Sequence, residues 1–280
     1  MRRRCLLLLL LRQAQALSGS TWDTLGLRPE TSASIAALGD FAAPTPVQAE
    51  AVPAIVAGDR DTIVHAQTGS GKTLAYLLPV ADVARGARAA DAGAAPSPYP
   101  RALVLVPNRE LGTQLQRVGA QLGAATKPPF DAAPFSLEAR HGGRLARWPY
   151  RPGACPDVLA ATPSFAAAFD KDLELWDHLR MVVLDEADML LDGGFKTQIE
   201  RCLVALKRAE RRRDAASDLI DATPRPRCRR VVVAATLPNQ GLRSVDSLVD
   251  KYFGEAARRP RGGPLVLIVL MYFKRIASAF

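Results

Sequence analysis

Asp61-Thr-Ile-Val-His-Ala66 runs directly into Gln67-Thr-Gly-Ser-Gly-Lys-Thr73, and this stretch decides the fold. The first segment carries three β-branched side chains in a row, Thr62, Ile63 and Val64, which favours a strand. The two glycines of the second segment allow a tight turn, and a helical pattern then continues over about 72–84. A strand, a glycine-rich loop and a helix in this order predict a backbone cradle for phosphate groups.

Further apolar runs have the length of strands and alternate with longer helical patterns. They lie at about 102–106, 135–140, 158–161, 181–184 and 231–235. The run at 102–106 ends at Pro107, and Asn108 then caps a predicted helix to about Leu122. Continuous apolar strands separated by helices are typical of a parallel sheet covered on both faces. The predicted fold class is therefore α/β, with three layers and a mostly parallel sheet.

The glycine-rich loop carries groups that suit a nucleoside triphosphate. Its backbone amides can turn toward phosphate oxygens, and the helix N-terminus adds partial positive charge. The Lys72 ammonium can reach the β- and γ-phosphates, and the Thr73 hydroxyl can hold Mg²⁺. The candidate cofactor-binding residues of the loop are Thr68, Gly69, Ser70, Gly71, Lys72 and Thr73.

An acidic segment, Asp185-Glu-Ala-Asp188, follows the predicted strand at 181–184. A carboxylate at the carboxyl end of a neighbouring parallel strand points toward the phosphates. We expect Asp185 to bind Mg²⁺ through water, and Glu186 to orient or deprotonate the attacking water. The candidate catalytic residues are thus Lys72, Asp185 and Glu186, and the candidate metal ligands are Thr73 and Asp185.

Charge and cysteine content limit the function classes. The net charge is +9, but the basic excess lies in residues 1–12, 201–230 and 255–280, so charge alone is weak evidence for nucleic-acid binding. The four cysteines form no Cys-x-x-Cys pair and only three histidines are present, which argues against a zinc site. The apolar runs at 6–11 and 264–273 are too short to span a membrane. We expect reduced thiols, an intracellular location and no membrane partner.

The phosphate loop at 66–73 and the Asp-Glu-Ala-Asp segment at 185–188 together resemble the DEAD-box family of ATP-dependent RNA helicases. Gly39-Asp-Phe41 and Pro44-Thr-Pro-Val-Gln48 are similar to that family's Q motif. The resemblance covers about residues 22–254. It implies an N-terminal RecA-like P-loop domain that uses ATP and Mg²⁺ and binds RNA.

The resemblance also implies how the base is recognised. The Gln48 amide is expected to read the adenine edge, which suits a carboxamide because it donates and accepts at once. Trp22, which lies 26 residues before Gln48, is expected to pack near the base.

Three further motifs follow in the family's order and imply RNA contacts. Pro107-Asn-Arg-Glu-Leu-Gly112 resembles the first motif, although Asn108 replaces the usual threonine. His141-Gly-Gly143 resembles the second motif, and Thr162-Pro163 opens the third. Ser164-Phe165 stands where the family has Gly-Arg, which removes one cation and predicts weaker RNA binding. The implied RNA-binding residues are Pro107, Arg109, Gly142, Gly143, Thr162 and Pro163.

A motif at 234–236 resembles the family's Ser-Ala-Thr motif, which links the state of the nucleotide to strand separation. Thr236 is kept, but Ala234 lacks the first hydroxyl, so a hydrogen bond toward Asp188 is expected to be missing. Asp188 and Thr236 are the implied coupling residues. We expect nucleotide binding to survive this change and the coupling to suffer.

The sequence predicts three segments. Residues 1–20 form an N-terminal extension or a targeting peptide, residues 21–254 the ATP-binding domain, and residues 255–280 a divergent hydrophobic tail. The tail is either a buried strand or sequence read through from outside the gene. A basic insertion at about 208–230 is predicted as a solvated loop, with an added contact to RNA phosphates as the alternative.

Only 26 residues follow residue 254, whereas a second RecA-like domain needs ~100 or more. We therefore expect that domain to be absent, together with its arginines, which are worth roughly 10³–10⁵ in turnover in related phosphoryl transfers. The chain alone is expected to bind adenine nucleotide weakly and to hydrolyse ATP negligibly. A second domain or a protein partner would have to complete the activity.

Two other function classes stay open beside a helicase. One is a non-catalytic module that binds nucleotide and RNA, and the other is a different phosphate-loop NTPase or a DNA translocase. Selectivity for adenine and for RNA over DNA separates the last class from a helicase. The expected location is the nucleus, nucleolus or cytoplasm, or a mitochondrion or plastid if the arginine-rich start is a presequence.

Overall fold

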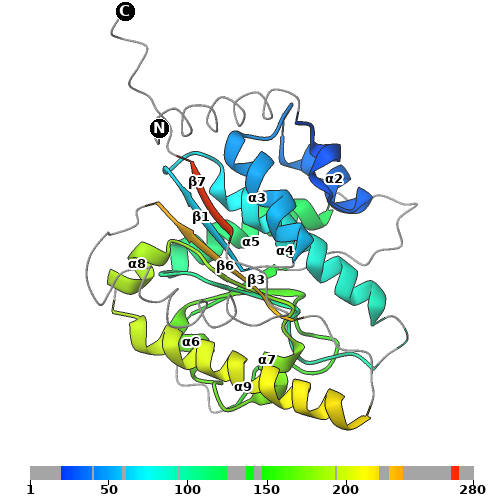
Figure 1. The fold of residues 1–280 in the computed structure, drawn as a ribbon, viewed down its shortest axis with the longest axis vertical. Coiled ribbons are helices and arrows are strands. Elements are labelled where there is room, and N and C mark those ends of the chain that lie inside the picture. Colours follow the sequence, from blue (N-terminus) through cyan, green and yellow to red (C-terminus); the bar gives the residue numbers. More distant parts are fainter. Residues whose placement is uncertain are drawn as a thin grey trace, which may run out of the picture.

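The computed structural model describes residues 20–39, 41–58, 61–91, 93, 95–124, 137–141, 147–192, 194–220, 227–235 and 266–270. Its centre is a seven-stranded sheet, and helices pack on both faces of that sheet (Figure 1). The predicted α/β class with three layers is therefore confirmed.

The sheet has the strand order β3-β4-β2-β5-β6-β1-β7, and every strand pair in it is parallel. Because the strands are parallel, their carboxyl ends share one edge of the sheet, and we call this the carboxyl edge. The strands are β1 (Thr62–Ala66), β2 (Ala102–Leu105), β3 (Leu137–Arg140), β4 (Val158–Ala161), β5 (Met181–Leu184), β6 (Arg229–Ala234) and β7 (Val266–Leu270).

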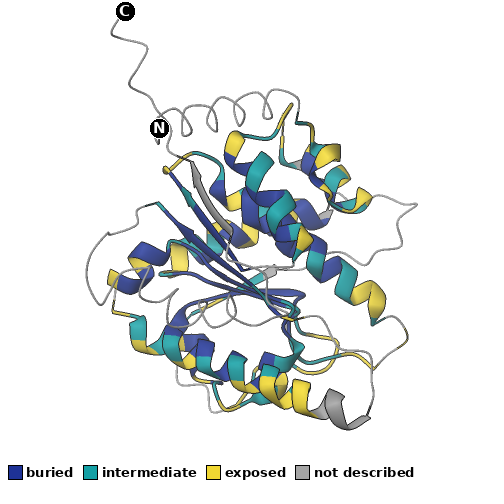
Figure 2. Cartoon of the chain, in the orientation of Figure 1, coloured by how far each residue is buried: buried dark blue, intermediate teal, exposed yellow. Residues whose placement is uncertain are grey.

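The central strands are buried on both faces, as Figure 2 shows by their dark blue colour. Along β5, Met181 and Val183 belong to one hydrophobic core, and Val182 and Leu184 belong to the other. Because side chains alternate between the faces of a strand, each strand must be apolar throughout when helices cover both faces. This is why the strands read as continuous apolar runs in the sequence.

The helices divide between the two faces (Figure 1). One face carries η1 (Trp22–Leu25), α2 (Pro29–Ser34), η2 (Ile35–Leu38), α3 (Pro46–Ala57), α4 (Lys72–Ala90) and α5 (Arg109–Ala124). The other face carries α6 (Pro163–Ala167), α7 (Leu173–His178), α8 (Ala187–Asp192) and α9 (Lys196–Ile220).

The prediction of a loop over about 208–230 is wrong for its first half, because α9 continues to Ile220. Arginine and alanine favour helices, and Ala209 is buried one turn beyond Leu206 and thus continues the apolar face. Arg213 extends the contact by pairing with Asp177 at 3.7 Å. Since α9 starts at the carboxyl edge and leads back to the first residue of β6, its basic end lies at the amino edge of the sheet.

Strand β7 lies within the segment predicted as a divergent tail. Its five residues pair with β1 in register, from Thr62 opposite Val266 to Ala66 opposite Leu270. A strand is one of the two alternatives given for this segment, and its origin outside the gene stays a prediction. It occupies the end of the sheet beside the strand that leads into the phosphate loop.

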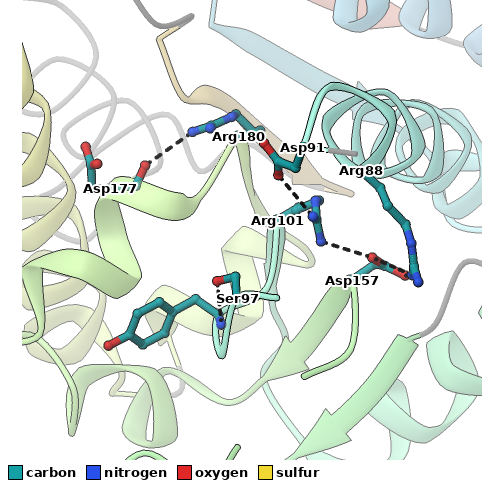
Figure 3. A network of polar contacts seen from close by, with 8 residues as sticks. Arg88, Asp91, Ser97, Arg101, Asp157, Asp177 and Arg180 are labelled. Carbon is teal, nitrogen blue, oxygen red and sulfur yellow. Dashed lines mark hydrogen bonds and ion pairs between the residues drawn. The ribbon is translucent and has the colours of Figure 1, made fainter. Parts of the chain in front are cut away.

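A group of ion pairs fixes the amino edge of the sheet (Figure 3). The buried carboxylate of Asp157 accepts hydrogen bonds from Arg88 at 3.1 Å and from Arg101 at 3.3 Å, and Arg101 also bonds Asp91 at 3.0 Å. The backbone oxygen of Asp157 accepts from the amide of Arg101 at 2.8 Å. The end of α4 and the starts of β2 and β4 are thus tied together.

The described thiols fit the expectation of reduced cysteines, since Cys155, Cys202 and Cys228 are free. Burial raises the pKa of the Cys202 thiol and of the Cys228 thiol to about 12. No helix in the described parts of the chain combines the length and the apolar character needed to cross a membrane.

Candidate nucleotide-binding site

The glycine-rich loop joins β1 to α4, as predicted, at the carboxyl edge of the sheet. Gly69 and Gly71 have φ angles of 78° and 95°, which side-chain-bearing residues rarely adopt. A methyl group on Gly71 would also lie 2.6 Å from Nε2 of Gln48, so any larger residue would displace the Gln48 amide in addition to straining the backbone. Thr68 and Gly69 are exposed at the rim of the loop.

Lys72 begins α4 and folds back over the loop. Its Nζ donates to the carbonyl oxygens of Ala66 at 2.7 Å and Gln67 at 3.1 Å, and the residue is 6% exposed. An ammonium group has three donors, so one donor remains for a phosphate oxygen. The positive charge is therefore held at the point where the amides of the loop converge.

Asp185 stands directly after β5, at the same edge of the sheet. The strand that separates β5 from β1 is β6, so the expectation that the two strands are neighbours is wrong. β5 ends at Leu184, opposite Val232, whereas β6 continues to Ala234. Asp185 therefore directly follows β5 at a level where β6 continues and β2 has ended.

Both oxygens of the Asp185 carboxylate accept hydrogen bonds. Oδ1 accepts from the amide of Glu186 at 3.0 Å, and Oδ2 accepts from the Tyr76 hydroxyl at 2.6 Å. Burial raises the pKa of Asp185 to about 6, and the Tyr76 hydrogen bond and Lys72 oppose this rise. The site thus holds a largely buried carboxylate whose two oxygens are both hydrogen-bonded.

Glu186 is half-buried and has a φ of 48°, in the left-handed region that residues other than glycine seldom occupy. Its carbonyl oxygen accepts the amide of Leu190 at 2.9 Å, which starts α8. Burial raises the pKa of its carboxyl group, and nearby Lys72 opposes the rise. A raised pKa suits a carboxylate that takes a proton from water.

The donor set fits Mg²⁺ bound together with nucleotide phosphates. Among the described residues there is no cluster of three or more His, Cys, Asp or Glu side chains that could hold a metal alone. The exposed Thr73 and the buried Asp185 offer one hydroxyl and one carboxylate. Mg²⁺ is commonly held by one or two protein oxygens, substrate phosphates and water, so these two residues suffice.

Gln48 lies in α3 and touches the phosphate loop. Its Oε1 accepts from the amide of Thr45 at 2.8 Å, and its Nε2 donates to the Gly71 carbonyl at 3.1 Å. The residue is 2% exposed. Its amide group therefore joins the start of α3 to the start of α4, and recognition of adenine by this amide stays a prediction.

Trp22 lies in η1, and its Nε1 donates to the Phe41 carbonyl at 2.8 Å. This bond brings Trp22 to the segment that leads into α3. Phe41 itself is 43% exposed. The predicted packing of Trp22 against a base stays a prediction.

The residues implied in RNA binding follow β2 and β4 at the carboxyl edge. Asn108 caps α5 as predicted, since its Oδ1 accepts from the Leu111 amide at 3.0 Å, and Pro107 and the exposed Arg109 flank it. Gly142 and Gly143 lie outside the described residues.

Thr162 and Pro163 open the short helix α6 as predicted, with the proline in its first turn. The expectation that Thr162 caps this helix is only half right. Its backbone has the extended cap conformation, but its side chain makes no cap bond. Its Oγ1 is buried without a partner.

Phe165 stands at the position where the resemblance calls for arginine, and it points into the core. It is 1% exposed, and its ring lies 5.4 Å from that of Phe169 and 6.4 Å from that of Trp148. An aromatic side chain that fills the core beneath α6 cannot reach a phosphate. The substitution therefore removes a cation from this surface, as the sequence predicts.

The predicted coupling residues are only partly described. Asp188 is 8% exposed and its Oδ1 accepts from the Met189 amide at 3.0 Å. Ala234 is fully buried, whereas Thr236 lies outside the described residues. His65 of β1 lies 3.1 Å, through its Nε2, from the carbonyl oxygen of Ala235.

Sequence reasoning missed Tyr76 and His65. Tyr76 lies one helical turn after Lys72, which is a signal that could have placed it on the face of α4 that meets Asp185. His65 is a polar residue in an otherwise apolar strand beside the phosphate loop. Neither spacing nor composition specifies their hydrogen-bond partners, because these come from distant parts of the chain.

Comparisons with known proteins give matches over most of the chain. The sequence profile described as DEAD/DEAH box helicase matches residues 45–245. The human "Probable ATP-dependent RNA helicase DDX28" is 36% identical over 223 residues, which are 79% of this chain and 39% of that protein. The "ATP-dependent RNA helicase MAK5" of Ajellomyces capsulatus is 32% identical over 254 residues, 84% of this chain and 31% of that protein. The chain spans less than half the length of these relatives.

Solved structures share the fold. The DEAD-box helicase Mss116 bound to ssRNA and UDP-BeF matches with a TM-score of 0.66 at 20% identity, over 89% of this chain and 45% of that chain. The RNA-helicase Prp28 from Chaetomium thermophilum bound to ADP matches with a TM-score of 0.57 at 26% identity, over 90% and 51% of the two chains.

Proposed function

We propose that this chain, which belongs to the DEAD/DEAH box helicase family, binds ATP with Mg²⁺ at its phosphate loop and RNA at the adjoining carboxyl edge. Joined to a second RecA-like domain, it would hydrolyse ATP to remodel RNA. The observation that carries the proposal is the convergence of Lys72, Asp185 and Glu186 on the loop between β1 and α4.

Each residue has a role in this proposal. The amides of the loop and the Lys72 ammonium hold the β- and γ-phosphates. Thr73 would hold Mg²⁺ directly and Asp185 would hold it through water, and the bound ion would neutralise charge that develops on the phosphates. Glu186 orients the attacking water and accepts its proton, which its raised pKa favours.

Adenine recognition is proposed for Gln48. Its amide already bonds the Gly71 carbonyl, so a base held by Gln48 would lie beside the loop that holds the phosphates. Replacing Gln48 by alanine should weaken ATP binding and remove a support of the loop, while α3 keeps its fold.

The proposals of RNA binding and of a second domain are supported by the similar proteins. The Mss116 structure has ssRNA bound, and the human and fungal relatives are named RNA helicases. On this chain, the exposed Arg109 and the start of α6 would face RNA phosphates. Phe165 and Ala234 favour weak RNA binding and weak coupling, so a module that binds without remodelling RNA is the second candidate.

Nucleotide binding tests the proposal directly. The purified chain would be titrated with a fluorescent ATP analogue, with ATP and GTP as competitors, alongside Lys72→Ala, Gln48→Ala and the control Lys171→Ala, which alters an exposed lysine after α6. We expect Lys72→Ala to lower affinity at least tenfold, Gln48→Ala to reduce the preference for ATP, and Lys171→Ala to change nothing. Equal binding by the wild type and Lys72→Ala would rule out the phosphate loop as the site.

Turnover separates the helicase from the binding module. We expect the 280-residue polypeptide alone to hydrolyse ATP negligibly. The arginines implied for a second RecA-like domain stabilise the transition state, and such an arginine raises turnover roughly 10³–10⁵-fold in related enzymes. Fusion to a second RecA-like domain of a relative should give RNA-stimulated hydrolysis if the site is catalytic. A folded fusion that binds ATP and RNA but never hydrolyses ATP would favour the binding module.

An intracellular location is also part of the proposal. ATP and RNA are intracellular, and the buried thiols of Cys202 and Cys228 suit a reducing compartment.

A further inference from the structure

Tyr76 is buried at the centre of the site and has no role in the function proposed above. It is 0% exposed and lies in α4, one turn after Lys72 and Thr73. Its hydroxyl donates to Oδ2 of Asp185 at 2.6 Å. This bond joins the helix that follows the phosphate loop to the strand that carries the acidic segment.

The bond determines how Asp185 presents its oxygens. Oδ2 is taken by Tyr76 and Oδ1 by the amide of Glu186, so the carboxylate is held from two sides. A hydroxyl that donates to a carboxylate forms a short, strong bond. Because both oxygens already accept a donor, the remaining lone pairs are left for the waters of a hydrated cation.

We propose that Tyr76 is a positioning residue, which orients the Asp185 carboxylate so that it binds the Mg²⁺ of a bound nucleotide through water. This inference rests on the proposed function, because it assumes a nucleotide in the loop. Groups that orient a metal ligand commonly change metal affinity about 10- to 100-fold when they are removed.

The hydroxyl could instead serve only to satisfy the nearest buried acceptor. The two roles differ in a measurable way. A positioning role acts on binding that depends on Mg²⁺, whereas a structural role acts equally on binding with and without Mg²⁺.

The experiment is a titration of the full chain with a fluorescent ATP analogue, once in Mg²⁺ and once in EDTA. We expect Tyr76→Phe to reduce the gain in affinity that Mg²⁺ gives by about tenfold, with affinity in EDTA within about twofold of the wild type. In an Asp185→Asn background, Tyr76→Phe should have no further effect on that gain, because the oriented carboxylate is gone.

Tyr99→Phe is the matched control. The Tyr99 hydroxyl also donates to a carboxylate, that of Asp172, at 3.2 Å, but Tyr99 precedes β2 and so lies at the amino edge. Tyr99→Phe should leave the affinity unchanged in both buffers. A loss of the same size in Tyr99→Phe would mean that the effect is not local, and would overturn the proposal.

Other outcomes would overturn either the positioning role of Tyr76 or the proposed function. If the wild type gains affinity from Mg²⁺ and Tyr76→Phe gains as much, or if Tyr76→Phe weakens binding equally in EDTA or unfolds the protein, Tyr76 has only a structural role. If the wild type binds no nucleotide in either buffer, the proposed function itself fails.

Discussion

Among single residues, Asp185 brings a carboxylate into a buried position where its charge is disfavoured. Burial raises its pKa to about 6, whereas an aspartate in the unfolded chain has a pKa near ~3.9. The folded state therefore binds a proton more tightly than the unfolded state. The free energy of unfolding consequently falls as the pH rises from about 4 to about 6, and this loss persists at neutral pH.

Asp185→Asn should therefore stabilise the protein without nucleotide. In EDTA at pH 7.5 we expect an increase of about 2 kcal/mol in the free energy of unfolding, measured by urea denaturation. At pH 4.5 the carboxyl group of the folded wild type is largely protonated, so the difference should shrink to about 1 kcal/mol or less. A variant that is less stable than the wild type at pH 7.5 would contradict this account of the site.

The sequence indicates residues whose chemistry depends on a local pattern, and it misses those whose partners are distant. Lys72 and Asp185 were predicted because each follows a strand in a recognisable order. The hydrogen bond between Tyr76 and Asp185 spans 109 residues of sequence, so no local pattern contains it. The burial of Phe165 likewise depends on Trp148 and Phe169, which the fold brings together.

At the scale of elements, the register of β2 and β4 depends on Asp157 (Figure 3). Its side chain is 5% exposed and pairs with Arg88 and with the largely buried Arg101. Asp157→Asn should lower the free energy of unfolding by about 2 kcal/mol, because it leaves the charge of Arg101 without full compensation.

The control for this prediction is Asp170→Asn. Asp170 also pairs with an arginine, Arg201, but the Arg201 side chain is 49% exposed, and such pairs contribute at most about 1 kcal/mol. Thermal or urea unfolding would compare the two variants. A loss for Asp157→Asn no larger than that for Asp170→Asn would refute the assigned role.

The position of α9 predicts which arginines matter for RNA. Arg109 is exposed at the carboxyl edge, whereas Arg211 and Arg212 are exposed near the end of α9, toward the amino edge. Arg109→Ala should weaken binding of single-stranded RNA severalfold and reduce the slope of log affinity against log salt by about 0.7.

The double change Arg211→Ala with Arg212→Ala should leave RNA affinity within about twofold, although it removes twice the charge. Fluorescence anisotropy over a range of salt concentrations measures both variants. If the double variant lost more affinity than Arg109→Ala, RNA would contact α9 or respond mainly to net charge.

Elements with a strong apolar pattern were predicted well. Elements that depend on contacts with distant parts of the chain were not. The bounds of β4 and β5 match the predicted 158–161 and 181–184, because both strands are apolar throughout. The end of α9 was predicted as a loop because arginines and alanines were read as an insertion, although both residue types favour helices. Whether residues 264–273 contain a strand could not be decided from the sequence, because the strand β7 is defined by its pairing with the distant strand β1.

For the molecule as a whole, the amino edge of the sheet stabilises the fold and the carboxyl edge carries the candidate site. Ion pairs around Asp157 fix the amino edge. The carboxyl edge carries Lys72, Asp185 and Glu186, where a strained backbone and raised carboxyl pKa values occur together. Such a division is expected when parallel strands collect reactive groups at one end and leave the other end to stabilise the fold.

A crystal structure of the chain with a non-hydrolysable ATP analogue and Mg²⁺ tests the central claim most directly. We expect the phosphates in the loop at 67–73, Mg²⁺ next to Thr73 and joined to Asp185 through water, and the adenine edge at Gln48. A nucleotide bound elsewhere, or an empty loop at saturating analogue in a correctly folded chain, would contradict the account.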